Sequence, residues 1–242
     1  MLLIAAATGW AARLGEPARR AFDRYTAAVE ARMAGTPRTD LRQLSEGKVR
    51  VEAVNGGSWA VPGGLLHHWR GAALIPGATA AEMLAVLRDS DHLARYYTPE
   101  VVSSRALRTE GDAAAIAMRF RKQKVITVVL DAEFAARSGL SGAGRGYSVS
   151  RSTHIWEVDD PGTGRERREP EGDDDGFLWR LNSYWCFAET AEGLVIECEA
   201  VSLTRDVPVG LGWLIRPIIQ ELPRESLEFT LRATKKALEA QR

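Results

Sequence analysis

The chain has 242 residues, of which 45% are hydrophobic and 26% are charged, so it can bury a full-sized core. Its 32 basic residues equal its 32 acidic residues, and this balance argues against a nucleic-acid-binding protein, which normally has a basic face. No apolar run reaches the roughly 18 residues that a transmembrane helix needs. Two cysteines, and four histidines without a His/Cys cluster, predict no disulfide framework and no metal site.

The first 15 residues are apolar and rich in small side chains. Such a stretch is typical of the middle of a secretory signal peptide, although no Lys or Arg precedes it here. Two interpretations are open. We favour the remnant of an export signal, which would place the protein in the periplasm or outside the cell, and the alternative is the start of an apolar helix.

Residues 16–46 predict a helix followed by a linker. Phe22, Tyr25 and Val29 recur at helical spacing, and the polar residues after the helix contain a proline. The main domain is then expected over residues 47–242.

The main domain starts with two predicted strands and a helix. The strands cover residues 48–54 and 65–75, and the helix opens at Thr79 with Glu82 three residues later, which is the pattern of a capping box. Period-two alternation then predicts further strands at residues 101–107, 113–120, 125–135, 147–158, 177–188 and 194–203.

Two segments of the second half do not follow the strand pattern. Residues 159–176 contain almost no apolar side chain and predict a solvated loop. Residues 207–222 are apolar and lead into a predicted helix over residues 223–242, in which Leu227 and Leu231 fall on one stripe. A minority interpretation makes residues 209–222 a lid or a segment that touches membranes transiently.

This order of elements predicts an α+β fold. A curved antiparallel sheet would pack around the long C-terminal helix. A single helix laid across a concave face leaves space beside it, and this space would form an internal cavity.

Several strings resemble the START-like, or helix-grip, superfamily, which includes lipid-transfer domains and polyketide cyclases. They are LLHHWRGAALI with the following helix and strand, the Leu-Arg-Asp-Ser-Asp stretch before Tyr96 and Tyr97, and GFLWRLNSYWCF with GLVIECEAVSLTRDVP. The second half is similar to a bacterial branch of the superfamily. The resemblance covers roughly residues 47–242. It implies a hydrophobic cavity with a lipid, sterol or polyketide ligand and no particular catalytic set.

The hairpin of residues 177–203 supplies candidate binding residues. A three-residue loop would pair Cys186 with Cys198 and place Asn182 and Tyr184 on the face of Cys198. That face is interpreted as a cavity wall with polar groups, and the alternative is a polar outer face. The two cysteines would be buried thiols, or a disulfide in an exported protein.

Other polar residues suggest chemistry less directly. Glu197 and Glu199 share a strand face, where they could act as an acid–base pair. We favour a solvated face with Arg151 or Arg180 as the ion partner. His67 and His68 are adjacent on a strand and point to opposite faces, so they cannot bind one metal ion.

We therefore predict binding or transfer of a hydrophobic, lipid-like small molecule, without catalysis and without a cofactor. The expected lining residues are Trp69, Met118, Phe134, Asn182, Tyr184, Cys198, Trp213, Leu227 and Leu231.

Two other functions stay open. One is a cyclase/aromatase-type enzyme acting on a polyketide-like substrate, with Tyr184, Arg180, His67 or Glu199 as acid–base groups. The other is an interaction module that uses the loop of residues 159–176. The sequence does not predict the oligomeric state.

Overall fold

The computed structural model describes residues 12–32, 37–44, 48–124, 126–206 and 212–240, and within the last range it describes side chains from residue 221 onward. The predicted export segment falls mainly on residues outside these ranges.

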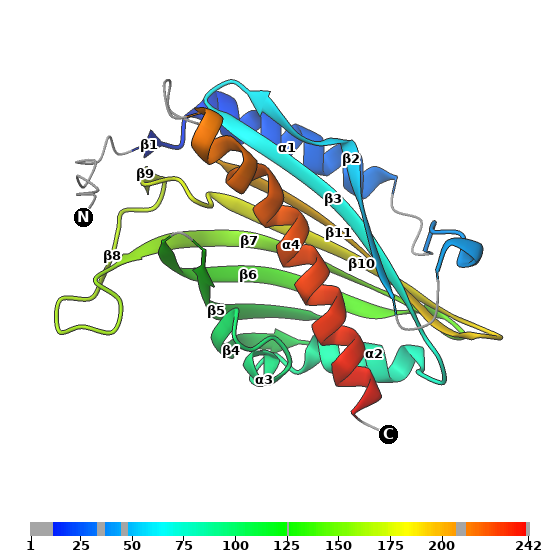
Figure 1. The fold of residues 1–242 in the computed structure, drawn as a ribbon. Coiled ribbons are helices and arrows are strands. Elements are labelled where there is room, and N and C mark those ends of the chain that lie inside the picture. The colour runs from blue at the N-terminus through cyan, green and yellow to red at the C-terminus, as the bar shows by residue number, and fades with distance from the viewer. Residues whose placement is uncertain (1–11, 33–36, 45–47, 125, 207–211, 241–242) are drawn as a thin grey trace.

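A single curved antiparallel sheet dominates the molecule, with its long strands in the order β2-β3-β11-β10-β7-β6-β5-β4 (Figure 1). The long strands are β2 (Val49–Val61), β3 (Gly64–Ile75), β4 (Val101–Glu110), β5 (Ala113–Gln123), β6 (Thr127–Gly142), β7 (Arg145–Asp159), β10 (Arg180–Thr190) and β11 (Gly193–Thr204). The short β8 (Arg167–Arg168) pairs with β7, and β1 (Ala12–Arg13) pairs with β9 (Asp173–Asp174).

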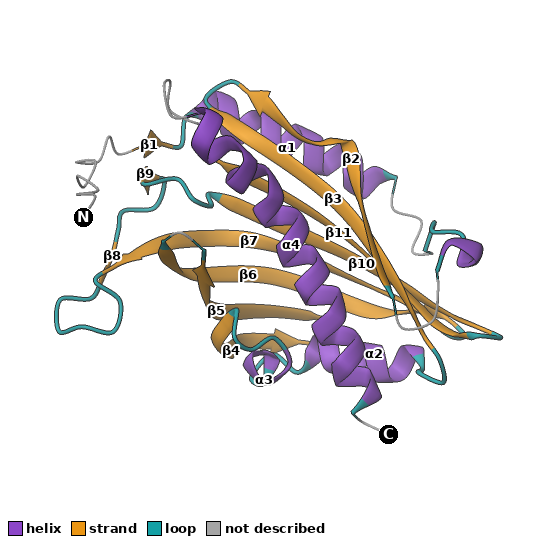
Figure 2. Cartoon of the chain, viewed as in Figure 1, coloured by secondary structure: helices purple, strands orange, loops and turns teal. Residues whose placement is uncertain are grey.

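Two helices cover opposite faces of this sheet (Figure 2). The C-terminal helix α4 (Gly212–Glu239) crosses the concave face, and α1 (Glu16–Ala31) packs on the other face, which we call the outer face. The shorter α2 (Ala80–Arg88) and α3 (Leu93–Tyr96) contact α4, and the 3-10 helix η1 (Leu41–Gln43) follows α1 in the chain. The predicted α+β helix-grip architecture is confirmed.

Helix α4 packs mainly against β3 and β2. Leu231 and Leu238 of the helix are fully buried in one cluster with Ile75 and Phe187 of the sheet. The closest approach is at Gly71, where an added Cβ atom would lie 2.4 Å from Leu231 Cδ1. Glycine is therefore needed at this position for the helix to sit against the strand.

Helix α1 buries Phe22 and Val29 against Leu66, Trp179 and Val201 of the outer face. The spacing of these two residues in the helix is the periodicity that predicted it. The N-terminal helix is thus packed on the sheet of the main domain.

Most predicted elements are confirmed, including the capping box of α2, in which Thr79 and Glu82 bond each other's backbone. Several boundaries differ, and β4, β5, β6 and β10 all continue beyond their predicted ends. Helix α4 begins at Gly212 instead of 223, and β2 continues to Val61 through a bulge after Ala53. The predicted loop of residues 159–176 contains two short strands, because its Asp174 is buried and accepts a hydrogen bond from Trp179 Nε1.

The predicted register of the β10–β11 hairpin is wrong by one residue. Thr190 pairs with Gly193, so the turn has two residues, and Cys198 pairs with Trp185 instead of Cys186. Because strand side chains alternate between faces, this slip moves every partner on one strand to the other face.

Candidate functional site

Solvent reaches part of the concave face although α4 lies over it. Beside the fully buried cluster under α4, several inward-facing side chains of β5, β6, β7 and β10 are only partly buried, while others such as Phe134 and Ile155 are buried. They include apolar Ala114, Met118, Phe120, Ala136 and Leu181, and hydroxyl-bearing Ser150, Ser152 and Ser183. We call these eight residues the open concave patch.

Six of the nine predicted lining residues lie on the concave side, either on the sheet or on the face of α4 that packs against it. These are Trp69, Met118, Phe134, Cys198, Leu227 and Leu231. Of the six, Met118 belongs to the open concave patch. Trp213 lies in α4, but its side chain is outside the described part of the helix.

Asn182 and Tyr184 lie on the outer face, which corrects the prediction that they share a cavity wall with Cys198. The Tyr184 hydroxyl donates to Glu30 of α1 at 3.0 Å and accepts from Asn182 Nδ2 at 3.0 Å. Burial raises the pKa of Tyr184 above its usual value. Both side chains therefore help to hold α1, and the cause of the error is the register slip.

The same slip separates the two cysteines. Cys198 faces α4 and Cys186 faces the outer side, so they are not cross-strand neighbours, and both are free and buried. Burial raises the pKa of Cys186 to about 12. Neither thiol is activated as a nucleophile.

A short polar chain crosses the concave face at the start of β3. His67 is fully buried, with Nδ1 2.7 Å from Ser58 Oγ and Nε2 3.0 Å from Thr204 Oγ1. Burial lowers the pKa of His67 to about 4, so the ring is neutral at pH 7. Ser58 and Thr204 could not be predicted as partners of His67, because Ser58 follows the bulge in β2 and its pairing cannot be counted from a turn.

Trp69 lies two residues further along the same face and pairs with Ala200. Its indole Nε1 is buried and, among the described residues, has no hydrogen-bond partner. The ring packs over Gly57, where an added Cβ atom would be 2.6 Å from the indole, so the glycine of the bulge makes room for this side chain.

A network of charged groups, with buried carboxylates and partly exposed arginines, lies on the outer face beside α1. Glu199 accepts from His68 Nε2 at 2.7 Å, from Arg32 at 3.0 Å and from Arg38. Because the carboxylate requires a donor at Nε2, the neutral His68 ring accepts at Nδ1 from the Tyr25 hydroxyl, 2.8 Å away. Burial, with help from the nearby arginines, lowers the pKa of His68 to about 3.

Glu197 completes the network. Its carboxylate accepts from the backbone N–H groups of Arg38 and Thr39, at 3.1 and 2.9 Å. Glu197 and Glu199 do share a face, as predicted, but the face is buried and the partners are Arg32 and Arg38 instead of Arg151 or Arg180. The segment after α1 is thus tied to β11 by buried carboxylates.

The residues named for an enzymatic alternative do not converge. His67 lies on the concave face, whereas Glu199 and Tyr184 lie on the outer face, and Arg180 pairs with Glu171. Among the described residues, no group of three or more His, Cys, Asp or Glu side chains is arranged to hold a metal ion. In the same part of the chain, every helix is too short or too polar to cross a bilayer.

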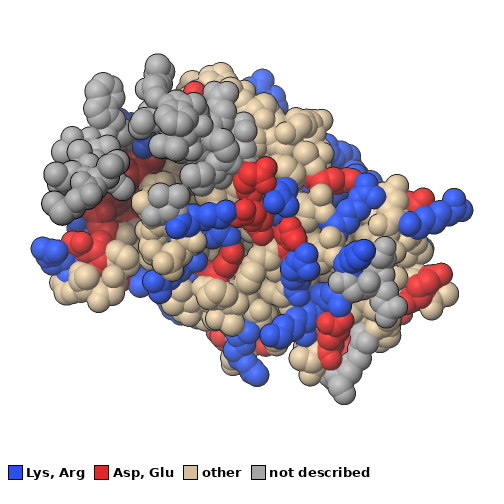
Figure 3. All heavy atoms as spheres, in the orientation of Figure 1, with Lys and Arg blue, Asp and Glu red and all other residues tan. Residues whose placement is uncertain are grey.

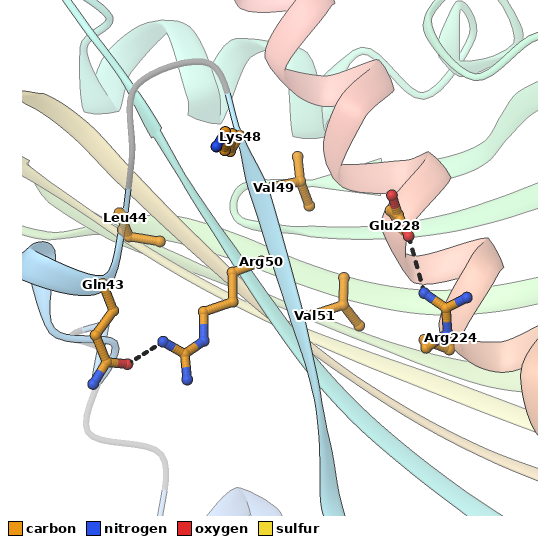
Figure 4. A pocket seen from close by; sticks show the side chains of 8 residues that line it. All are labelled: Gln43, Leu44, Lys48, Val49, Arg50, Val51, Arg224 and Glu228. Atoms are coloured by element: carbon orange, nitrogen blue, oxygen red, sulfur yellow. Dashed lines mark hydrogen bonds and ion pairs between the residues drawn. The ribbon is translucent and has the colours of Figure 1, made fainter.

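A pocket of about 370 Å³ lies at the edge of the sheet, outside the open concave patch. It is formed by β2, α4 and the segment around η1, and its walls include Lys48, Arg50 and Arg224 (Figure 4).

These features define a START-like helix-grip fold, and comparison with solved structures agrees. The chain is similar to human STARD10 with a TM-score of 0.50 and 16% identity, over 95% of this chain and 84% of that one. It is also similar to the lipid transfer and protein localization domain of human StarD13, with a TM-score of 0.51 and 8% identity over 89% and 95% of the two chains.

A third similar structure is the Zhui aromatase/cyclase from Streptomyces sp. R1128, with a TM-score of 0.49 and 14% identity over 73% of this chain and 95% of that one. At these identities the likeness shows the fold alone. No family model and no curated protein matches the chain.

Proposed function

We propose that this protein binds and carries a hydrophobic, lipid-like small molecule on its concave face, between α4 and strands β5, β6, β7 and β10. The observation that carries the proposal is the open concave patch. Its apolar side chains Met118, Phe120 and Leu181 face inward and yet stay partly exposed. The molecule therefore retains apolar surface that a ligand can cover.

The free energy gained by burying apolar surface is large enough to bind an apolar ligand. Transfer of each CH₂ group from water to an apolar surface contributes about 0.8 kcal/mol, so a ten-carbon chain gains roughly 8 kcal/mol before the entropy cost of binding. The hydroxyls of Ser150 and Ser183 lie opposite each other on neighbouring strands of the same patch. They can bind one polar group of the ligand, as in other pockets that are mostly apolar.

Neighbouring alanines on β6 provide the test. Ala136 belongs to the open concave patch, whereas Ala135 is exposed on the outer face. Ala136→Trp should fill the patch, and Ala135→Trp places the same side chain on the opposite face. We expect Ala136→Trp to weaken binding of an NBD-labelled C16 fatty acid at least tenfold and Ala135→Trp to change it less than twofold.

Native mass spectrometry of protein purified without detergent should find an apolar molecule bound to the wild type. Circular dichroism and thermal unfolding check that both tryptophan variants are folded. Equal binding by the two variants, or no binding of the fatty acid by the wild type and no co-purified molecule, would contradict the proposal.

A further inference from the structure

The outer edge of β2 is a second surface, which the binding proposal does not use. β2 is the last strand at one end of the sheet. It pairs with β3 along one side, and among the described residues no strand pairs with it along the other side. Within the described ranges, no backbone hydrogen bond joins residues 49–53 to a segment other than β3. An open strand edge of this kind can pair with a strand from another chain.

The pocket of about 370 Å³ lies along this edge. Val49 and Val51 pair with Ala73 and Gly71 and so face the concave side, toward α4. Arg50 points to the opposite side, where it donates to Gln43 (Figure 4). An occupant of the pocket would therefore meet apolar side chains on one side of the strand and a cation on the other.

Basic residues also outnumber acidic residues in the lining of the pocket. Lys48, Arg50 and Arg224 are among its lining residues, against one carboxylate, Glu228. The side chains of Arg50 and Arg224 are 42% and 35% exposed, and Lys48 has no ion pair with another described residue. On the face drawn in Figure 3, Lys and Arg side chains lie among Asp and Glu side chains, and the whole chain has no net charge.

We infer that this edge binds an extended acidic segment of a partner protein, which pairs with β2 as an added strand. Backbone pairing satisfies the open edge, and alternate side chains of the added strand reach Arg50 on one side and the valines with Arg224 on the other. A small anion would leave the strand edge unused, and an apolar peptide would leave Lys48 without a carboxylate, whereas Arg50 and Arg224 already pair with Glu52, Glu221 and Glu228 and can share an added one. Binding at this edge does not require a ligand on the concave face.

The first test uses a fluorescein-labelled peptide that alternates Glu and Val over seven residues, with Glu at both ends. In one control Lys replaces every Glu, and in the other Pro replaces the central Val, which keeps all four carboxylates and removes one backbone donor. By fluorescence anisotropy, the dissociation constant should rise at least tenfold for the basic peptide and at least fivefold for the proline peptide. Equal affinity for the acidic and proline peptides would overturn strand addition.

The second test compares the two edges of the sheet. Lys48→Glu and Arg50→Glu should each weaken binding of the acidic peptide at least fivefold. Arg105→Glu on β4, the strand at the opposite end of the sheet, is the matched control and should have less than a twofold effect. If Arg105→Glu weakens binding as much, the attraction is general and the inference is wrong.

The Ala136→Trp variant separates this inference from the proposed function. It should bind the acidic peptide like the wild type while its fatty-acid binding is lost. Loss of peptide binding in this folded variant would show that the edge is not an independent site.

Discussion

Under α1, the outer face of the sheet buries Glu199 and His68, and each of these groups has hydrogen-bond partners. Under α4, the concave face carries the open concave patch, where small hydroxyl and apolar side chains are still reached by solvent. An amphipathic helix lies over each of the two faces, so the presence of a helix alone does not decide whether solvent reaches the face beneath it.

The difference lies in the side chains between helix and sheet. A buried carboxylate is costly unless every oxygen is paired, so the outer-face network requires the segment after α1 to stay in one place. The small serines and alanines of the concave face need no fixed partner, and they leave space between the sheet and the helix. The outer face is therefore suited to anchoring the N-terminal segment, and the concave face to exchanging a ligand.

The largest effect is expected from breaking the outer-face network. Glu199→Ala would leave His68, Arg32 and Arg38 without their shared acceptor, and we expect a loss of about 3 kcal/mol in the free energy of unfolding. Urea unfolding followed by circular dichroism measures it.

The matched control is Glu192→Ala in the exposed turn between β10 and β11, which should stay within about 0.5 kcal/mol of the wild type. A loss below about 1 kcal/mol for Glu199→Ala would mean that the network contributes little to anchoring, and the contrast between the faces would lose its basis.

A second prediction uses a buried carboxyl on the concave side. Glu157 shares its face with Ile155, and burial, with the nearby charge of Asp174, raises its pKa to about 8. The folded protein then holds a proton that the unfolded chain has lost above its ordinary pKa of 4.5. The contribution of Glu157 to stability is therefore full below pH 4.5 and is lost as the pH rises through 8.

Glu157→Gln cannot ionise, so its stability relative to the wild type should increase by about 2 kcal/mol between pH 6 and pH 8. Urea unfolding at several pH values measures this difference. Parallel pH profiles for the two proteins would show that Glu157 ionises at its ordinary pKa.

The smallest effect concerns the contact of α4 with β3. Gly71→Ala places a Cβ atom against Leu231 and should cost about 1–2 kcal/mol, because the packed helix must shift. In the double variant with Leu231→Ala the added methyl group has room. The loss of stability of the double variant should therefore be smaller than the sum of the losses of the two single variants. Simple additivity would mean that the backbone of β2, and not α4, opposes the new side chain.

Local patterns in the sequence predicted the fold well. Thr79 and Glu82 placed the start of α2, the spacing of Phe22 and Val29 placed α1, and the alternation of apolar residues placed the strands. Each of these signals comes from neighbours in the chain, which physical chemistry relates directly to helix or strand geometry.

The site could be predicted only in part, because it depends on strand register. One residue in the turn at Ala191 and Glu192 decided whether Tyr184 and Asn182 faced α4 or α1. The outer-face network was also out of reach, because Arg32 and Arg38 lie about 160 residues from Glu199 in the sequence. The spacing of the arginines alone does not indicate which strand they meet.

The uneven packing of α4 has a consequence for how the concave face opens. The helix is fixed along β3 and β2, and Phe229 and Ala233 pack on a cluster formed by α3, β4 and β5. Near residue 225, by contrast, a partly exposed ion pair between Glu225 and Lys124 joins the helix to the β5–β6 turn. Such a pair is worth little in water. Among the described residues, the helix is therefore held more weakly near Glu225 than near Phe229 and Leu231, and a ligand would reach the concave face beside the β5–β6 turn.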